Sequence, residues 1–167
     1  LKESGIPVVG IGKIEDIFAG QGITESEHSK SSVHGMEQTI QKAKELKEGL
    51  VFTNLVDFDA LWGHRRDPVG YGKEIEAFDV KLGELLSVLG EDDLVMLTAD
   101  HGNDPTHTGT DHTRETVPLL MYAKSMSGQA KLEDSDTFGV IGATVAKNFA
   151  VDLPDSLIGE SILEKLV

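Results

Sequence analysis

Metal-competent side chains gather in two stretches of this 167-residue sequence. One stretch follows an apolar run that begins at Leu94, and it carries Asp100, His101, His107, Asp111 and His112. The other follows an apolar run that begins at Leu50, and it carries Asp57, Asp59 and His64. The sequence has no cysteine, and aspartate with histidine suits Mn²⁺, Zn²⁺, Fe or Mg²⁺ at a catalytic site better than a closed structural zinc site. The ligands exceed what one tetrahedral ion needs, which indicates two ions in one site.

Some of these side chains have simpler explanations. A single aspartate after a strand is usually a turn or a helix cap, and Asp57 fits that role. Three histidines fit ordinary packed or surface positions: His28, His34 and His107. The simple explanation is weaker for Asp100, His101 and His112, because burying these groups without a metal would leave polar atoms unsatisfied. Spacing alone therefore favours a metal site that contains Asp100, His101 and His112.

Alternating strands and amphipathic helices are expected to position both clusters. Apolar, β-branched runs predict strands at 6–11, 50–56, 93–99 and 117–122. Helical spacing of apolar residues predicts helices at 33–46, 72–89 and 141–149, with a further helical pattern at 162–166. Residues 21–32 are polar and rich in turn formers, and they predict a connection whose Ser31 or Ser32 caps the next helix. This order predicts a three-layer α/β/α domain with a largely parallel sheet, and both clusters then project from the same edge of that sheet.

The charge balance limits the partners of the chain. Fifteen basic and 29 acidic residues give a net charge of −14, which argues against nucleic acid and anionic membranes as partners. A phosphorylated substrate would also be repelled unless bound divalent cations inverted the local field. The absence of cysteine suits the cytoplasm, the apolar runs are too short to span a membrane, and no signal peptide is visible.

Lys13 ends a G-I-G-K segment that follows the first predicted strand. Two glycines and a lysine after a strand invite a phosphate-loop interpretation, but neither the dinucleotide fingerprint nor the Walker pattern is complete. On the residues alone, a tight turn with a solvated lysine is the better interpretation.

Longer motifs resemble the alkaline phosphatase superfamily. They are T-A-D-H-G-N-D-P-T at 98–106 and T-D-H-T-R-E-T-V-P at 110–118. N-L-V-D-F-D-A-L-W-G-H-R-R-D at 54–67 and G-I-G-K-I-E-D-I-F at 10–18 resemble its bacterial phosphopentomutase family more specifically. The resemblance implies an isomerase that interconverts the 1- and 5-phosphates of ribose and deoxyribose through a phosphothreonine enzyme and two Mn²⁺ or other divalent ions.

The resemblance also implies roles for individual residues. Asp59, His64 and His112 match the ligands of one ion, Asp100 and His101 match part of the shell of the other, and Lys13 matches a lysine that contacts substrate phosphate. The roles of Arg65, Arg66 and His107 stay open. Two alternatives stay open as well: a related metal-dependent phosphoglycerate mutase or phosphatase, and a non-catalytic metal-binding fragment.

Parts of the family pattern have no counterpart in this sequence. These parts are an N-terminal aspartate, the nucleophilic threonine and the cap domain, and the sequence opens without methionine. Residues 1–167 are therefore predicted to be the C-terminal segment of the catalytic core, with no catalytic nucleophile of their own and no mutase activity alone. Their expected partners are a pentose phosphate and the missing segments of the same protein.

Overall fold

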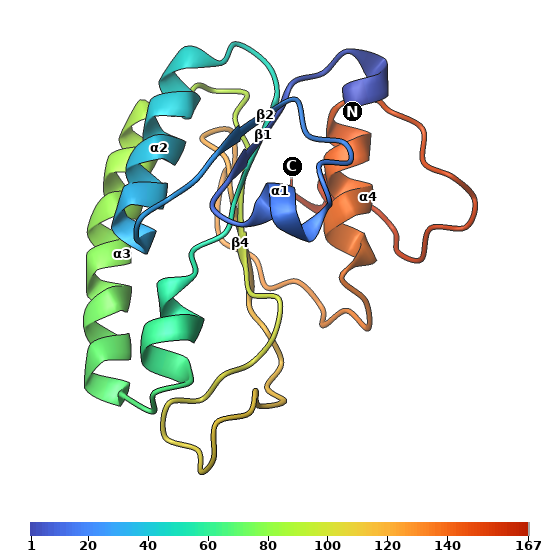
Figure 1. Cartoon of the computed structure of the whole chain (residues 1–167). Coiled ribbons are helices and arrows are strands. Elements are labelled where there is room, and N and C mark those ends of the chain that lie inside the picture. The colour runs from blue at the N-terminus through green and yellow to red at the C-terminus, as the bar shows by residue number, and fades with distance from the viewer. Residues whose placement is uncertain (167) are drawn as a thin grey trace.

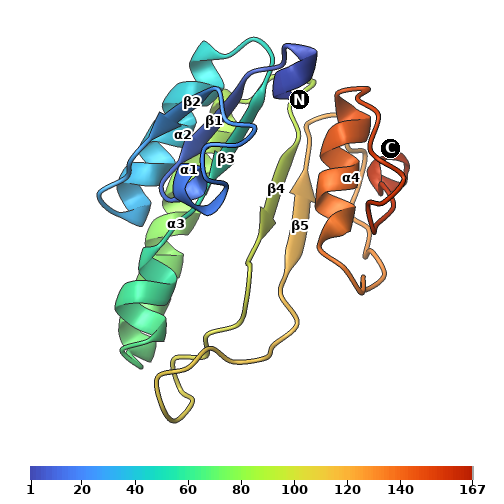
Figure 2. The same cartoon turned by 45° about the vertical axis from the view of Figure 1, so that its right-hand side comes forward.

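Helices lie on both sides of a central layer of strands in the computed structural model of the chain, which describes residues 1–166 (Figure 1). Helices α2 (Ser32–Glu45) and α3 (Pro68–Val88) pack together on one side of the strands. Helix α4 (Gly139–Asn148) lies on the other side, beyond the last strands (Figure 2). The short helix α1 (Ile14–Ile17) follows the first strand directly. The predicted α/β/α arrangement is confirmed.

The strands form two groups rather than one continuous sheet. Strands β1 (Val8–Ile11), β2 (Glu25–Glu27) and β3 (Leu50–Thr53) make a parallel sheet in the order β2-β1-β3. Strands β4 (Val95–Thr98) and β5 (Leu119–Tyr122) pair antiparallel, with Val95 opposite Tyr122. Within residues 1–166, no strand pairing joins β3 to β4. The sheet is thus largely parallel as predicted, but it is divided between its third and fourth strands.

The central strand β1 is buried because β2 and β3 pair along its two edges and helices α1 and α2 pack against it. Val9 and Ile11 are 1% and 0% exposed, as expected for a strand of continuous apolar residues inside a parallel sheet. By contrast, β3 and β5 expose apolar side chains, and Phe52, Leu120 and Tyr122 are 41%, 61% and 40% exposed. The strand predicted at 93–99 is present as β4, and three of its four residues are half-buried.

Strand β2 lies in the stretch that was expected to be only a polar connection. The sequence of β2 has no alternation of apolar and polar residues that would predict a strand. Its two glutamates are instead bound by the buried ammonium group of a lysine. The Lys42 ammonium of α2 pairs with Glu25 and, at 2.9 Å, with Glu27. The Lys42 side chain is 11% exposed, so these ion pairs fasten the edge strand to the helix.

Two helical boundaries also differ from the prediction. Helix α3 begins at Pro68, four residues before the predicted start, because the Asp67 side chain accepts a hydrogen bond from the Gly70 amide at 2.8 Å and proline is favoured at the first helical position. The helical pattern expected at 162–166 is a single 3₁₀ turn, Leu163–Lys165. The predicted cap of the helix after residues 21–32 is confirmed, since the Ser31 hydroxyl accepts a hydrogen bond from the His34 amide at the start of α2.

Packing between α2 and α3 supports the segments that lead to the polar clusters. Met36 and Ile40 of α2 pack with Leu85 of α3 and with Leu89, and all four are buried. Leu55, just after β3, packs against this cluster, and so does Val95 of β4. The core therefore anchors both chain segments immediately before they reach the polar loops. No helix within the described residues is long and apolar enough to cross a membrane.

Candidate metal centre

Asp59 and His64 are brought together by a π-helical turn. This element, η2 (Phe58–Gly63), follows β3, and the His64 amide donates to the Asp59 carbonyl at 2.9 Å. In an α-helix, residues five apart would point about 140° away from each other around the axis. The π turn closes over five residues instead, and it leaves the Asp59 Oδ1 and His64 Nε2 atoms 3.3 Å apart. Such turns are frequent at functional sites.

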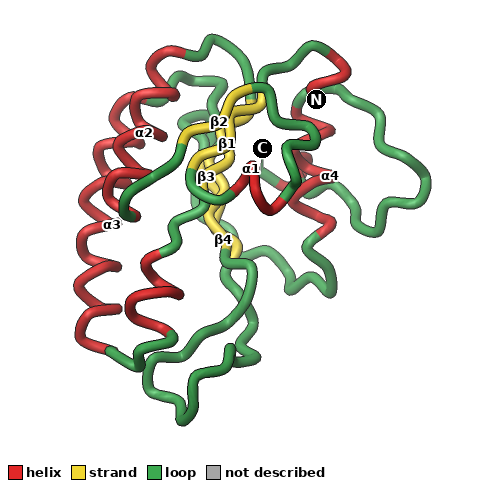
Figure 3. Tube along the Cα trace, viewed as in Figure 1, coloured by secondary structure: helices red, strands yellow, loops and turns green. Residues whose placement is uncertain are grey.

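His112 arrives from a distant part of the chain on the long loop between β4 and β5, here called the β4–β5 loop (residues 99–118; Figure 3). An isolated antiparallel bridge between Gly102 and Thr113 closes the loop, with the Thr113 amide donating to the Gly102 carbonyl at 2.9 Å. The His112 Nε2 atom then lies 3.3 Å from Asp59 Oδ1 and 3.1 Å from His64 Nε2. The structure thus brings together one side chain from the cluster after β4 and two from the cluster after β3.

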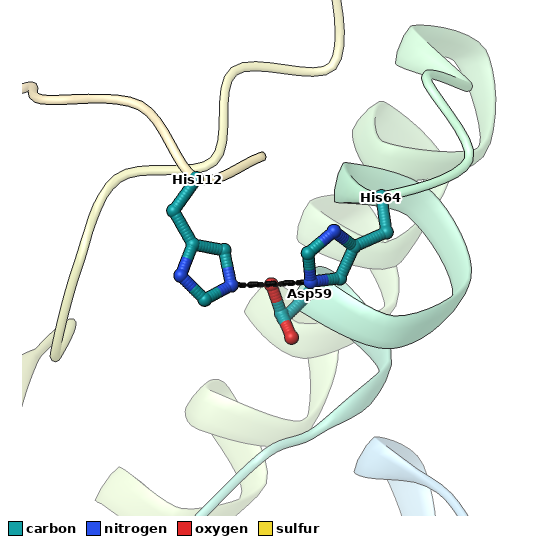
Figure 4. A group of neighbouring side chains, drawn as sticks. All are labelled: Asp59, His64 and His112. Carbon is teal, nitrogen blue, oxygen red and sulfur yellow. Dashed lines mark hydrogen bonds and ion pairs between the residues drawn. The ribbon is translucent and has the colours of Figure 1, made fainter. Parts of the chain in front are cut away.

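The separations within the group fit a bound divalent ion. All three donor atoms lie within 4.8 Å of one another, and the two imidazoles point their Nε2 atoms toward the carboxylate (Figure 4). A tetrahedral ion with ligand distances of about 2.0–2.1 Å separates its ligand atoms by about 3.3–3.4 Å. An octahedral ion at similar distances separates neighbouring ligand atoms by about 2.8–3.0 Å. The observed 3.1–3.3 Å falls between these values.

Outer contacts fix the chemical state and orientation of the group. The Thr110 carbonyl can only accept, so His64 donates from Nδ1 to it at 2.6 Å and keeps the Nε2 lone pair for the centre. Asn103 donates from Nδ2 to Asp59 Oδ1 at 2.6 Å. Between 36% and 46% of each of the three side chains is exposed, so the group opens to solvent. An ion or a small molecule from solution can therefore reach the three side chains.

Asp100 and His101 lie beside this group without completing a second one. The His101 ring stacks on the His112 ring, with centroids 3.7 Å apart and planes 19° apart. His101 Nδ1 lies 3.1 Å from the Gly102 carbonyl, which leaves Nε2 free on the other side of the ring. The Asp100 carboxylate is 3.8 Å from that Nε2 atom and is 76% exposed. Within residues 1–166, no third His, Asp or Glu joins this pair in a metal-binding arrangement.

Lys13 makes no direct polar contact with the three-residue group. It is exposed at the end of β1 and precedes α1, and no hydrogen bond or ion pair of the described residues links it to Asp59, His64 or His112. The turn before it is tight: Gly12 has a φ of +81°, and a Cβ there would lie 2.4 Å from the Asn54 carbonyl. The turn thus packs against the segment after β3, at the carboxyl edge of the parallel sheet.

The remaining candidates have structural positions. Asp57 Oδ2 accepts from the Ser32 amide at 2.7 Å, so Asp57 serves the start of α2. Its side chain makes no capping bond to η2, the turn that directly follows it, so it supports a distant helix rather than the local cap that was predicted. His34 accepts at Nδ1 from the Lys30 amide at 3.1 Å and is half-buried. His28 and His107 are exposed, in agreement with the surface interpretation.

Charge and burial affect two neighbouring groups. Burial, together with the negative charge of Asp59, raises the pKa of the Tyr71 hydroxyl. In the β4–β5 loop, hydrogen bonds from the Thr106 hydroxyl and amide lower the pKa of the Asp104 carboxyl, and both bonds are 2.7 Å long. Asp104 therefore stays ionised and holds a local turn in the loop.

Sequence reasoning missed three features of the site. No sequence pattern predicts the π turn, Asn103 was not assigned to the site, and Arg66 was assigned no role. The Arg66 guanidinium makes four hydrogen bonds to the β4–β5 loop. The only available signal was that Asn103 and Arg66 both fall inside the motifs that carry the family resemblance.

The layered fold and the aspartate–histidine group together fit the class of α/β/α proteins that bind metal ions. In agreement, residues 8–153 match the metalloenzyme superfamily, and the chain belongs to this superfamily. All 167 residues are 60% identical to the phosphopentomutase of Clostridium tetani, and 166 residues are 61% identical to that of Agathobacter rectalis. The chain spans only 42% of the length of each of these relatives.

A solved structure agrees with the fold assignment. The phosphoglycerate mutase of Leishmania mexicana is similar with a TM-score of 0.74 and 18% identity, over 96% of this chain and 38% of that protein. At this identity the likeness concerns the fold alone. The chain is therefore a homologue of phosphopentomutases with an alkaline-phosphatase-like fold.

Proposed function

We propose that this chain is the metal-binding part of a phosphopentomutase, an isomerase that interconverts ribose or deoxyribose 1-phosphate and 5-phosphate. The observation that carries the proposal is the convergence of Asp59, His64 and His112, from segments 48 residues apart, in a chain 60% identical to phosphopentomutases. In this proposal the three side chains hold one divalent ion, and Asp100 with His101 supplies part of the shell of a second. Mn²⁺ is the proposed ion at both positions.

The chemistry of phosphoryl transfer explains why such a chain needs cations. Divalent ions bound at the centre would withdraw electron density from phosphoryl oxygens and offset the charge that develops during in-line transfer. The protein itself has a net charge of −14, which opposes the approach of a dianionic sugar phosphate. Lys13, at the carboxyl edge of the sheet, is the proposed contact of the substrate phosphate. The reaction uses a phosphothreonine, and we assign no threonine of this chain to that role.

We also propose that other segments of the same longer protein complete the site. The chain spans 42% of its phosphopentomutase relatives, and β3 and β4 each lack a partner on one edge within the described residues. An apolar depression beside β4, lined by residues such as Leu82, Leu86 and Leu97, supports a covered rather than a solvated face. These features suit segments that provide the second ion's remaining ligands, the nucleophilic threonine and a cap. The cysteine-free composition suits a cytoplasmic enzyme.

Two other functions are less well supported. A related phosphoglycerate mutase or phosphatase shares the fold, but the likeness to the Leishmania mexicana phosphoglycerate mutase is 18% against 60% for the phosphopentomutase. A non-catalytic metal-binding fragment would need only the Asp59 group, and it describes the 167 residues when they stand alone. Turnover of ribose 1-phosphate, compared with turnover of 3-phosphoglycerate by the same protein, distinguishes a phosphopentomutase from a phosphoglycerate mutase.

A chimeric enzyme tests the proposed function directly. The 167 residues replace the matching 42% of the Clostridium tetani phosphopentomutase, and conversion of ribose 1-phosphate to ribose 5-phosphate is followed by ³¹P NMR with Mn²⁺. We expect turnover by the chimera and none by the 167-residue chain alone. A folded chimera without turnover would contradict the phosphopentomutase assignment, and turnover by the chain alone would contradict the proposed need for further segments.

Calorimetric titration tests the metal centre separately from activity. We expect Mn²⁺ to bind the 167-residue chain, and Asp59→Ala, His64→Ala or His112→Ala to weaken binding strongly. Asp57→Ala is the matched control, because it removes a carboxylate two residues from Asp59 that serves α2 instead. Equal affinity in all four variants would remove the assignment of the ligands while leaving the family membership untouched.

A further inference from the structure

Arg66 connects the two chain segments that carry the proposed ligands. Its Nε donates to the Gly109 carbonyl at 2.5 Å, and Nη2 donates to the Asp111 carbonyl at 2.6 Å. Nη1 donates to Asn103 Oδ1 and to the Asp104 carbonyl, both at 2.7 Å. All three guanidinium nitrogens are therefore bonded, and every acceptor belongs to the β4–β5 loop.

The acceptors show that Arg66 does not act as a simple counter-charge. None of the four is a carboxylate, although the chain contains 29 acidic residues. Three backbone carbonyls and one amide oxygen are instead arranged around the flat donor fork, which only arginine can present. The contacts thus fix the path of the loop backbone.

The contacts of Arg66 continue directly to the ligand side chains. Asn103, which accepts from Arg66, donates in turn to Asp59 Oδ1 at 2.6 Å. Three consecutive carbonyls just before His112 are also held: those of residues 109 and 111 by Arg66, and that of Thr110 by His64. The position of His112 therefore depends on bonds from the turn that carries its fellow ligands.

The backbone of Arg66 is specialised for this position. Its φ is +53°, in the left-handed region that residues with a side chain seldom adopt. The Arg66 amide donates to the Gly63 carbonyl at 3.1 Å, so the strained residue lies in a tight turn between η2 and α3. Such a conformation persists where surrounding contacts determine it, and the four loop contacts are of that kind.

We propose that Arg66 is a positioning residue that holds the β4–β5 loop so that Asn103 and His112 meet Asp59 and His64 in metal-binding geometry. This inference rests on the proposed metal centre. It assigns no contact between Arg66 and the ion or the substrate. The proposal predicts that loss of Arg66 weakens cation binding, whereas a purely electrostatic role of Arg66 predicts that its loss strengthens cation binding. Removing a positive charge near a cation site should strengthen cation binding, whereas releasing the loop should weaken it.

The test compares Arg66→Ala with Arg65→Ala in the full 167-residue chain. Arg65 is adjacent and exposed and makes no hydrogen bond within the described residues, so both variants lose one charge at nearly the same place. Calorimetry with Mn²⁺ should give an affinity about 10–100-fold weaker for Arg66→Ala and unchanged or slightly stronger for Arg65→Ala. Millimolar ethylguanidinium should restore part of the affinity of Arg66→Ala alone.

A second variant and a metal-free readout keep the inference testable if Arg66→Ala unfolds or the chain binds no ion. Arg66→Lys retains the charge but not the donor fork, and we expect it to bind Mn²⁺ nearly as weakly as Arg66→Ala. In metal-free samples, the His64 Nδ1 proton that bonds Thr110 should exchange faster in Arg66→Lys than in Arg65→Ala by NMR. Wild-type affinity and exchange in Arg66→Lys would overturn the role of Arg66. Absent Mn²⁺ binding by the wild type, with faster exchange in Arg66→Lys, would overturn only the proposed centre.

Discussion

Gly63 allows Asn103 to reach Asp59, and an alanine at this position tests the geometry of the whole centre. A Cβ on Gly63 would lie 2.5 Å from Asn103 Nδ2, 2.6 Å from its Cγ and 3.1 Å from its Cβ. Non-bonded heavy atoms settle at about 3.5–4.0 Å, so Asn103 would have to withdraw by about 1 Å. Its 2.6 Å hydrogen bond to Asp59 would then lengthen beyond the range of a hydrogen bond.

The magnitude of the effect follows from this lost bond. A hydrogen bond to a charged group contributes about 1.5–3 kcal/mol. Loss of an outer partner of a metal ligand typically weakens metal affinity by about 10–100-fold, which corresponds to about 1.4–2.7 kcal/mol. We therefore expect Gly63→Ala to bind Mn²⁺ about 10–100-fold more weakly than the wild type, measured by calorimetry.

The control is Gly72→Ala, on the exposed face of α3. Nothing lies within 4 Å of a Cβ at Gly72, so that variant should keep its metal affinity and gain about 0.5–1 kcal/mol of stability against thermal unfolding. An Asn103→Ala background removes the two shortest contacts and leaves only the 3.1 Å contact to the Cβ of residue 103, so adding Gly63→Ala should weaken binding little further. If Gly63→Ala binds as tightly as Gly72→Ala, the contact from Asn103 to Asp59 does not support the centre and the reasoning fails.

Three further predictions concern the scaffold and the loop. Lys42→Met should lower the free energy of unfolding by about 2 kcal/mol, because it removes charge-assisted bonds to Glu25 and Glu27. The hydrogen bonds that the Lys42 ammonium donates to Glu25 and Glu27 raise the pKa of Lys42 in the fold, so its contribution to stability is complete below about pH 10 and declines as pH rises further. Urea unfolding of wild type and variant from pH 7 to 11 should therefore show the stability difference shrink only at the alkaline end. Asp57→Ala should cost about 1 kcal/mol in urea unfolding through its cap on α2, and a loss of metal affinity comparable to that of Asp59→Ala would contradict this assignment. Thr106→Ala should raise the pKa of Asp104 toward its usual value, measured by carboxyl ¹³C NMR, since both hydrogen bonds that lower it come from Thr106 and one is lost.

Most regular elements could be predicted because they bury apolar faces with a clear period. The stripe on α3 and the continuous apolar run of β1 are of this kind. Strand β2 could not be predicted, because its glutamates are satisfied by Lys42, which lies 15 residues beyond Glu27 in the sequence. Local pattern carries no information about such a distant partner.

The residues of the candidate metal centre could also be predicted, but the geometry that unites them could not. Asp59 and His64 are five residues apart, a spacing that places side chains on different faces of an α-helix, and only the π turn corrects this. The role of Arg66 is equally hidden, since its acceptors lie 37 to 45 residues away and three of the four are backbone carbonyls. A carbonyl acceptor leaves no trace in the identity of its residue.

The turn that carries Asp59 and His64 is supported by the apolar core, whereas the loop that carries His112 is held by polar bonds. Metal affinity and the stability of the fold should therefore respond to different substitutions. Asp59 and His64 sit on a turn between β3 and α3, next to the packed cluster that holds Leu55. His112 sits on a largely exposed loop that is joined to the turn by polar bonds from Arg66, His64 and Asn103. Exposed polar bonds add little to global stability, whereas the position of a ligand controls its contribution to binding. Substitutions in the loop should therefore lower metal affinity while leaving the unfolding midpoint nearly unchanged, and substitutions such as Leu85→Ala in the core should do the reverse.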